Sequence, residues 1–282
     1  MLKQQTVARR IKNPIERLHP DINATRARVA LFDFDGTLSL IRTGWEQVMI
    51  PMMVEILAGL GSGETVRELT TIVEEYVARL TGEQTIYQMI ELARQVELRG
   101  GKALAPLEYK KNYHEALMRG IRDIRESLRR GEVFPDEYLV PGTRAFLEAL
   151  RSRGLTLYCA SGSDQIYTRE EAHLLQIAEY FDGGIYGALE DYRSFSKEIL
   201  IQKMISSGEY RGEELLGFGD GYVEIKNVKE AGGVAVGVAT DEPKCRRVNG
   251  TKRKRLAAVG ADFIVPNFLA REDILEMLFG ER

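Results

Sequence analysis

The C-terminal half of the chain alternates short apolar runs with segments of helical periodicity, and this alternation restricts the fold more than any other feature. Runs of strand length occupy residues 155–160, 215–218, 234–238 and 263–265, with a short extended segment at 184–186. Helical spacing of apolar residues separates them, at residues 143–150, 164–178, 197–206 and 223–231. Strands separated by helices pair in parallel, so we predict an α/β fold with a doubly wound parallel sheet.

One more strand and a long helical region precede this half. Residues 28–31 form an apolar run that is stopped by Asp33, Asp35 and Gly36, as expected for a buried strand with a polar carboxyl end. Apolar residues then recur at three- and four-residue spacing over residues 64–80, 86–96 and 106–130. We therefore predict an all-helical inserted domain at 40–138 and a catalytic core built from 1–39 and 139–282.

Composition and charge exclude several other classes of protein. The 39 Lys and Arg residues nearly balance the 42 Asp and Glu residues, which gives a formal net charge of −3. Only Cys159 and Cys245 are present, so neither a disulfide framework nor a zinc motif can be assembled. No apolar run has the roughly 20 residues of a membrane span, and the first residues are charged, unlike a signal peptide. We expect a cytoplasmic protein without a membrane partner.

Polar residues that can handle phosphate follow the predicted strands. Asp33 and Asp35, two positions apart, can face one site, where one carboxylate attacks and the other moves protons. Ser161 and Gly162 offer a hydroxyl and an accessible backbone N–H before a helix, which suits a phosphate oxygen.

Two further segments complete this set of polar residues. Asp220 and Glu224 can share the first turn of a helix and face a hard cation. Lys197 begins the helix before that strand. Each feature alone has an ordinary explanation as a turn, a helix start or a solvated charge. Because ligands bind at the carboxyl ends of the strands in such sheets, their joint occurrence favours one site.

In their order these residues resemble the four motifs of the haloacid dehalogenase-like (HAD) superfamily, and within it the Mg²⁺-dependent phosphatases. Asp33 to Leu38 resembles the first motif, Ser161-Gly162 the second, Lys197 the third, and Gly219 to Glu224 the fourth, where Glu224 replaces the more common Asp. The resemblance covers about 28–38 and 140–266. It implies a Rossmann-like core with the helical cap domain inserted between the first two motifs.

The resemblance also implies a reaction: hydrolysis of a small phosphate monoester through an aspartyl-phosphate intermediate. Asp33 would be the nucleophile and Asp35 the acid and base, while Ser161, Gly162 and Lys197 would bind the substrate phosphate. Mg²⁺ would be bound by Asp33, Asp35 through its backbone carbonyl, and Asp220, with support from Glu224. Dehalogenases that resemble this fold need neither an acid two residues after the nucleophile nor a metal ion. Asp35 and Asp220 therefore favour phosphate chemistry over carbon–halogen cleavage.

The substrate and two alternative functions stay open at this stage. By analogy with family members that have a comparable cap, we expect a sugar phosphate or a short phosphorylated acid such as phosphoglycolate. A phosphomutase would keep the same residues. A run of seven basic residues within 244–255 could instead guide a nucleic-acid end to the site, although a solvated face is the favoured interpretation. Arg42 and Trp45 could reach the substrate, whereas Lys110, Lys111 and His114 are expected to face solvent.

Overall fold

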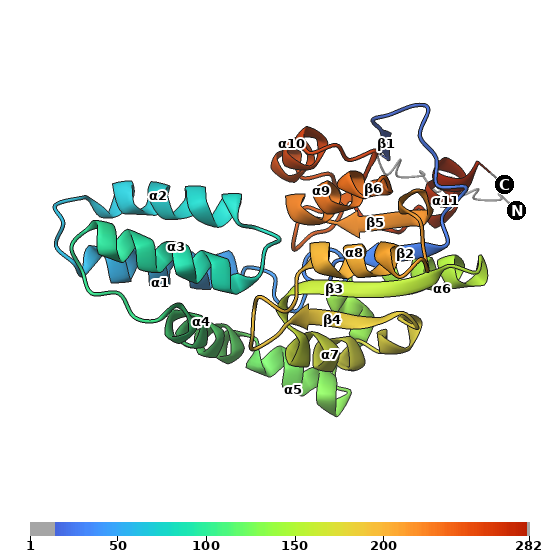
Figure 1. Cartoon of the computed structure of the whole chain (residues 1–282). Coiled ribbons are helices and arrows are strands. Elements are labelled where there is room, and N and C mark those ends of the chain that lie inside the picture. The colour runs from blue at the N-terminus through green and yellow to red at the C-terminus, as the bar shows by residue number, and fades with distance from the viewer. Residues whose placement is uncertain (1–14, 281–282) are drawn as a thin grey trace, which may run out of the picture.

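The core of the molecule is one twisted sheet whose parallel strands all end at the same edge (Figure 1). The computed structural model describes residues 15–280, and within them seven strands follow the order β1-β7-β6-β5-β2-β3-β4. All neighbouring pairs are parallel except β1 with β7. The strands are β1 Glu16–Arg17, β2 Val29–Phe32, β3 Thr156–Asp164, β4 Gly184–Ala188, β5 Leu215–Gly219, β6 Val234–Val238 and β7 Phe263–Val265.

Alternate residues of β2 point to opposite faces of the sheet, and helices cover both. Ala30 and Phe32 belong to one apolar core, and Val29 and Leu31 to the other, as the two-residue period of a strand requires. The first core includes residues of α6 Thr143–Ser152, α7 Gln165–Leu174 and α11 Arg271–Phe279, and the second those of α8 Lys197–Ser206, α9 Tyr222–Glu230 and α10 Gly250–Ala258. The predicted doubly wound α/β core is confirmed.

Residues 46–120, which follow β2, form helices that stand beyond the carboxyl edge of the sheet (Figure 1). The inserted helical domain predicted from the sequence is thus confirmed. Its exact bounds, 40–138 against a core of 1–39 and 139–282, stay a proposal, and residues 1–14 and 281–282 lie outside the described part. The helices are α1 Glu46–Ala58, α2 Val66–Arg79, α3 Thr85–Leu98, α4 Pro106–Gly120 and α5 Arg122–Arg130.

The helical periodicity over residues 106–130 corresponds to two helices and not to one, so its prediction as a single helix was wrong. At Ile121 the backbone leaves helical geometry (φ −100°, ψ 6°), which ends α4 and starts α5. The two helices then have different partners: α5 packs on α7 of the core, where Arg125 and Arg129 form ion pairs with Glu170. A change of packing partner overrides the apolar periodicity, which alone would continue the helix.

Several other elements differ from the predictions. The strand at 155–160 continues to Asp164, and the helix expected at 164–178 ends at Leu174, before the short 3₁₀ helix Ala178–Tyr180. Further 3₁₀ turns are Pro135–Tyr138 and Gly212–Glu214. The sequence prediction also missed β1, α1 and α11. For α1 the reason is visible, because it is apolar on nearly all sides and contains Pro51.

Stacked and edge-on phenylalanines fill the centre of the first core. The rings of Phe32 and Phe218, on neighbouring strands, are stacked with centroids 4.4 Å apart, and Phe146 and Phe268 contact both. All four side chains are buried. Because Phe32 and Phe218 lie directly before the polar ends of β2 and β5, this rigid packing fixes where the next residues begin.

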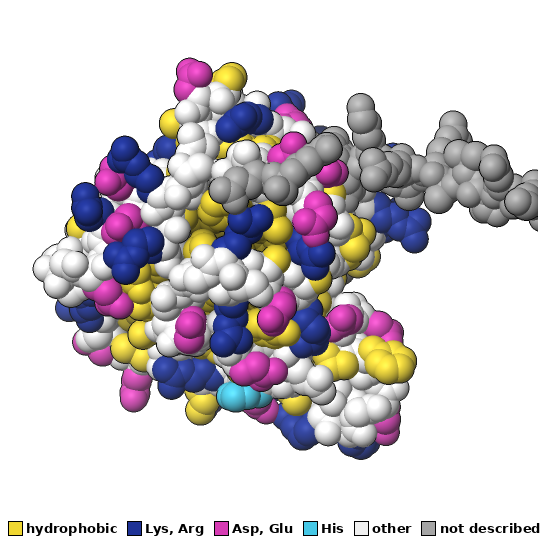
Figure 2. Space-filling model, turned by 90° about the vertical axis from the view of Figure 1, so that its right-hand side faces the viewer, with side chains coloured by type: hydrophobic (Ala, Val, Ile, Leu, Met, Phe, Trp, Pro, Cys, Tyr) yellow, Lys and Arg dark blue, Asp and Glu magenta, His cyan; other side chains and the backbone are white. Residues whose placement is uncertain are grey.

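The surface of the core away from the inserted helices has mixed charge. Figure 2 shows this face, where Lys and Arg side chains are interspersed with Asp and Glu. Among the described residues, no helix combines the length and the hydropathy that crossing a bilayer requires.

Candidate active site

Asp33 lies at the carboxyl end of β2, in the centre of the sheet edge that faces the inserted helices. Its backbone N–H donates to the carbonyl of Phe218 at 2.9 Å, which extends the pairing of β2 with β5 by one residue. The chain then turns sharply at Gly36, where φ is +76° and glycine is favoured. A side chain there would also collide with Asp220, because a Cβ would lie 2.5 Å from its Oδ2. The turn after Asp33 is therefore packed against the fourth motif.

Lys197 joins the third and fourth motifs to the first. Ser196 caps α8 by accepting the N–H of Ile199, which fixes Lys197 at the helix start. The buried Lys197 Nζ donates to Asp33 Oδ1 at 2.7 Å and forms an ion pair with Glu224, also buried. The sequence analysis placed Glu224 among the residues that support the metal ion, whereas in the structure Glu224 pairs with Lys197.

The electrostatic environment of Asp33 makes its ionisation costly. Burial raises its pKa to about 6 from an ordinary 3.8, and the negative charge of Asp220 adds to the rise. Lys197 acts in the opposite direction by stabilising the carboxylate. Asp33 is thus a carboxylate with reduced hydration, held by one lysine, which is a suitable state for a nucleophile.

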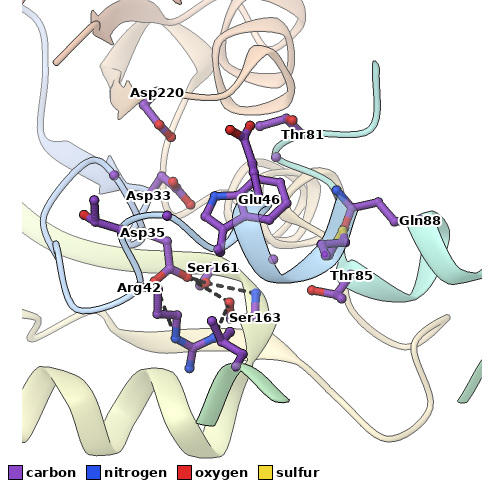
Figure 3. Close-up of a pocket in the computed structure, with 18 of the residues that line it drawn as sticks. Asp33, Asp35, Arg42, Glu46, Thr81, Thr85, Gln88, Ser161, Ser163 and Asp220 are labelled. Carbon is purple, nitrogen blue, oxygen red and sulfur yellow. Dashed lines mark hydrogen bonds and ion pairs between the residues drawn. The ribbon is translucent and has the colours of Figure 1, made fainter. Parts of the chain in front are cut away.

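Asp35 points to a different group of partners from those of Asp33 (Figure 3). Its Oδ2 accepts hydrogen bonds from Ser163 Oγ at 2.8 Å and from Ser161 Oγ at 3.3 Å. Its Oδ1 is buried and, in the part of the chain described, has no hydrogen-bond partner. Ser163 was not assigned a role from the sequence, although it stands two residues after Ser161. The two carboxylates of the first motif therefore occupy distinct environments.

Arg42 is buried beside Asp35 and lines the same cavity. Its Nε and Nη2 each donate to Glu171 at 3.0 Å, and its Nη1 donates to Ser163 Oγ at 2.8 Å. Its Nε also lies 3.7 Å from Asp35 Oδ1. Glu171 is fully buried on α7, so this two-point pair joins the segment after the first motif to the core.

Asp220 follows β5 and meets a lysine that sequence reasoning had assigned only to the basic run. Lys252 Nζ, from α10, donates to Asp220 Oδ2 and to Glu242 Oε1, both at 2.6 Å. Glu242, in the loop after β6, was missed altogether. The only sequence signal for either residue is that both follow β6, a neighbour of β5 in the sheet.

The other residues of the basic run are divided between the site and the surface. Arg255 lines the same cavity as Lys252, and Arg253 forms an ion pair with Glu16 of β1. Lys244, Arg246, Arg247 and Lys254 are exposed.

A cavity of about 340 Å³ connects these residues to the inserted helices. On the helical side it is lined by Thr81, Thr85 and Gln88, and by Glu46 at the start of α1 (Figure 3). Trp45, which directly precedes α1, also lines it. Its lining also includes Lys110 and His114, so the expectation that these two side chains face solvent was wrong. Helix α4 turns this face toward the core, where Lys110 forms an ion pair with Asp164 and His114 stacks on Tyr167.

The loop between α2 and α3 closes directly over the motif residues. A Cβ on Gly162 would lie 2.5 Å from the carbonyl oxygen of Glu83, and one on Gly221 would lie 3.1 Å from the Cα of Gly82. Gln84 Nε2 secures the loop by donating to the carbonyls of Tyr192 and Phe195, just before α8. The glycines of the second and fourth motifs therefore permit a close approach between backbones.

The structure thus brings together all the residues that the sequence singled out for the site. Asp33, Asp35, Ser161, Gly162, Lys197 and Asp220 line one cavity, and Glu224 contacts Lys197 beside it. Among the described residues, no group of three or more His, Cys, Asp or Glu side chains is arranged to bind a metal ion.

Several solved structures share this fold. A predicted phosphoglycolate phosphatase from Haemophilus somnus superimposes with a TM-score of 0.57 at 15% identity, covering 89% of this chain and 98% of that one. A predicted phosphatase from Clostridium acetobutylicum gives 0.56 at 18% identity, with coverages of 89% and 99%. A β-phosphoglucomutase from Clostridium difficile gives 0.56 at 16%, with coverages of 89% and 97%. At these identities the likeness shows the fold alone.

Sequence comparison assigns the family. No curated protein matches the chain. A family model described as haloacid dehalogenase-like hydrolase matches residues 27–232, well over half of the chain. The matched range begins just before β2 and ends after α9, so it includes all four motif segments and the inserted helices. The chain therefore belongs to the haloacid dehalogenase-like hydrolase family.

Proposed function

We propose that this hydrolase is a Mg²⁺-dependent phosphatase that cleaves a small phosphate monoester through an aspartyl-phosphate intermediate. One observation carries the proposal: the carboxylates of the first motif have separate partners. Asp33 is held by Lys197, whereas Asp35 is held by Ser161 and Ser163. One acid is thereby prepared to attack and the other to exchange a proton. We also propose a cytoplasmic location, which suits the free, buried Cys159 and Cys245.

Each step then has a residue in a position to perform it. Asp33 attacks the phosphorus, a new oxygen–phosphorus bond forms, and the bond to the substrate oxygen breaks. Asp35 donates a proton to the leaving alkoxide. The same carboxylate then removes a proton from the water that hydrolyses the aspartyl-phosphate. Ser161, the Gly162 N–H and Lys197 bind the phosphate oxygens.

The donor atoms at the sheet edge fit Mg²⁺. Mg²⁺ prefers oxygen ligands and usually takes one or two carboxylates together with water. The Asp33 and Asp220 carboxylates and the Asp35 backbone carbonyl supply such a set, with Glu224 in support through Lys197. Burial is the main cause of the raised pKa of Asp33, and the negative charge of nearby Asp220 adds to it, which supports a cation site between these two acids. When bound, the ion would neutralise charge on the phosphate and on these acids.

The charges around the helical side of the cavity favour an uncharged, hydroxylated leaving group, such as a sugar, over a second anion. Lys110 is neutralised by Asp164, and Arg42 by Glu171. Burial lowers the pKa of His114, so its ring is neutral at pH 7. Glu46 adds a negative charge to the lining, whereas Thr81, Thr85 and Gln88 offer neutral hydrogen-bonding groups.

The nucleic-acid alternative has less support. Of the seven basic residues, Lys252 is held by two carboxylates and Arg253 by Glu16, so fewer charges remain for a phosphate backbone. The mutase alternative uses the same residues, and no feature of the cavity favours it over hydrolysis.

We predict that a panel of phosphate monoesters will separate neutral from anionic leaving groups. With Mg²⁺, sugar phosphates should release inorganic phosphate with a higher kcat/KM than phosphoglycolate. Gln88→Leu should raise the KM for the best sugar phosphate by about tenfold, the effect of one lost hydrogen bond of ~1.4 kcal/mol. Gln95→Leu on the same helix, away from the cavity, is the matched control. A preference for phosphoglycolate would contradict the charge argument, and isomerisation without phosphate release would indicate a mutase.

Replacing the nucleophile should abolish turnover without unfolding the protein. Asn has the shape of Asp33 but cannot form an acyl phosphate, so Asp33→Asn should lower kcat by at least about 10⁴-fold. Stopped phosphate-release assays measure the rate, and circular dichroism checks the fold. Asp123→Asn, on the exposed side of α5, serves as the control. Near-normal turnover by Asp33→Asn would exclude Asp33 as the nucleophile.

The same variant should be more stable than the wild type at high pH when a chelator is present. Between pH 3.8 and about 6 the folded protein holds the Asp33 proton more tightly than the unfolded chain. Stability therefore falls as pH rises through this window, by up to about 3 kcal/mol at 1.36 kcal/mol per pKa unit. Asp33→Asn should raise the Tm at pH 8 and change it little at pH 4. An equal change at both pH values would rule out this environment for Asp33.

Removing divalent cations should stop the reaction. The carboxylates and a dianionic phosphate repel one another by ~4 kcal/mol per charge pair at 4 Å and an effective dielectric of 20. Excess chelator should thus lower activity to background, and added Mg²⁺ should restore it. Asp220→Asn should require a higher Mg²⁺ concentration for half-maximal rate. Full activity in chelator would refute the metal site.

A further inference from the structure

Lys252 places a permanent positive charge on a carboxylate that the proposed metal site needs. Its Nζ lies 2.6 Å from Asp220 Oδ2, and Asp220 Oδ2 itself is packed against the backbone at Gly36. The lysine side chain is only 16% exposed. Its ammonium group therefore occupies the side of Asp220 that faces the cavity lining.

The position of Lys252 is fixed by the local structure of α10. Asn249 caps this helix through Oδ1, which accepts the N–H groups of Thr251 and Lys252. The side chain then reaches across to β5 from the first turn of the helix. The backbone of Lys252 is thus held in a capped helix turn, which a lysine that contacted Asp220 by chance would not require.

Glu242 gives the same ammonium a second, independent anchor. Its Oε1 accepts from Lys252 Nζ at 2.6 Å, and its Oε2 accepts from Thr43 Oγ1 at 3.0 Å. Thr43 lies between the first motif and α1, so the second oxygen of Glu242 is held independently of Asp220. An ammonium released by Asp220 would keep Glu242 as a partner and would not be left buried without a counter-charge.

We propose that Lys252 is a positioning residue that holds Asp220 in the metal-free protein and competes with the divalent cation for it, moving to Glu242 alone when the cation binds. The inference rests on the metal site of the proposed function. A divalent cation that bound Oδ2 of Asp220 would meet the ammonium already held by that oxygen, and the two positive charges would repel each other. Lys252 therefore keeps Asp220 neutralised and ordered before the cation arrives, and it weakens the binding of that cation.

Substitution of Lys252 tests the competition through metal affinity, independently of catalysis. Calorimetric titration of Mn²⁺ and Mg²⁺ into substrate-free protein should show at least tenfold tighter binding for Lys252→Met than for the wild type. Lys254→Met removes the same charge from the exposed side of the same helix and should stay within about twofold of the wild type. Lys252→Arg, which keeps the charge, should also bind weakly. Unchanged or weaker binding by folded Lys252→Met would overturn the proposal.

A measurement on the wild-type protein covers the case in which Lys252→Met does not fold. An amine-acylating reagent should label Lys252 slowly without metal, because the ammonium is held by two carboxylates. Labelling measured by mass spectrometry should increase several-fold with saturating Mg²⁺, whereas that of Lys254 should not change. No increase at Lys252 would overturn the competition. If neither wild type nor Lys252→Met binds a divalent cation, the metal site itself fails, and the phosphate-release panel then decides separately whether the enzyme is a phosphatase.

Discussion

The ion pairing of Lys197 with Asp33 and Glu224 is the interaction on which the site depends. It brings together residues from the end of β2 and the starts of α8 and α9, and all three side chains are buried. Buried carboxylates without a counter-charge would be protonated or would destabilise the fold. The sheet can therefore end in closely spaced acids only because a lysine is buried with them. Lys252 repeats this arrangement for Asp220 and Glu242.

The sequence predicted best what depends on local pattern. The bounds of β6, β7 and α8 were predicted without error, because short apolar runs and a Ser cap define them within a few residues. The convergence of the motif segments was also predicted, because parallel strands necessarily bring their carboxyl ends to one edge. Here a simple topological rule turns separate positions of the sequence into neighbours.

What the sequence could not predict depends on tertiary contacts. Lys252 lies within a basic run that resembles a solvated surface, and only the packing of α10 beside β6 turns this one residue inward. Glu242 has no local signature at all. The turn of Lys110 and His114 toward the cavity follows from the break at Ile121, which itself reflects the different partners of α4 and α5. Such choices are made by the whole fold and not by residues near in sequence.

The segment between the first motif and α1 connects the chemistry to the inserted helices. Within four residues, Arg42 forms its pair with Glu171 and Thr43 donates to Glu242, while Gly44, at φ +83°, lets the chain turn into α1. Both bonds end on the core, so this segment is fixed at its base. Movement of the helices relative to the sheet must therefore begin beyond Thr43, which leaves Asp33 and Asp35 undisturbed.

The α2–α3 loop, unlike the segment after the first motif, lies directly over the acidic residues of the site. It reaches the motif glycines through close backbone approaches at Gly162 and Gly221 and is held on the core side by Gln84. Such approaches exclude water from the Lys197 and Glu224 side of the site. Burial is the largest cause of the raised pKa of Asp33, so separation of this loop from the sheet would hydrate the site and lower that pKa. Closure of the helical domain and the basicity of Asp33, the proposed nucleophile, are thus physically linked, since the contact that encloses the cavity also removes water from this carboxylate.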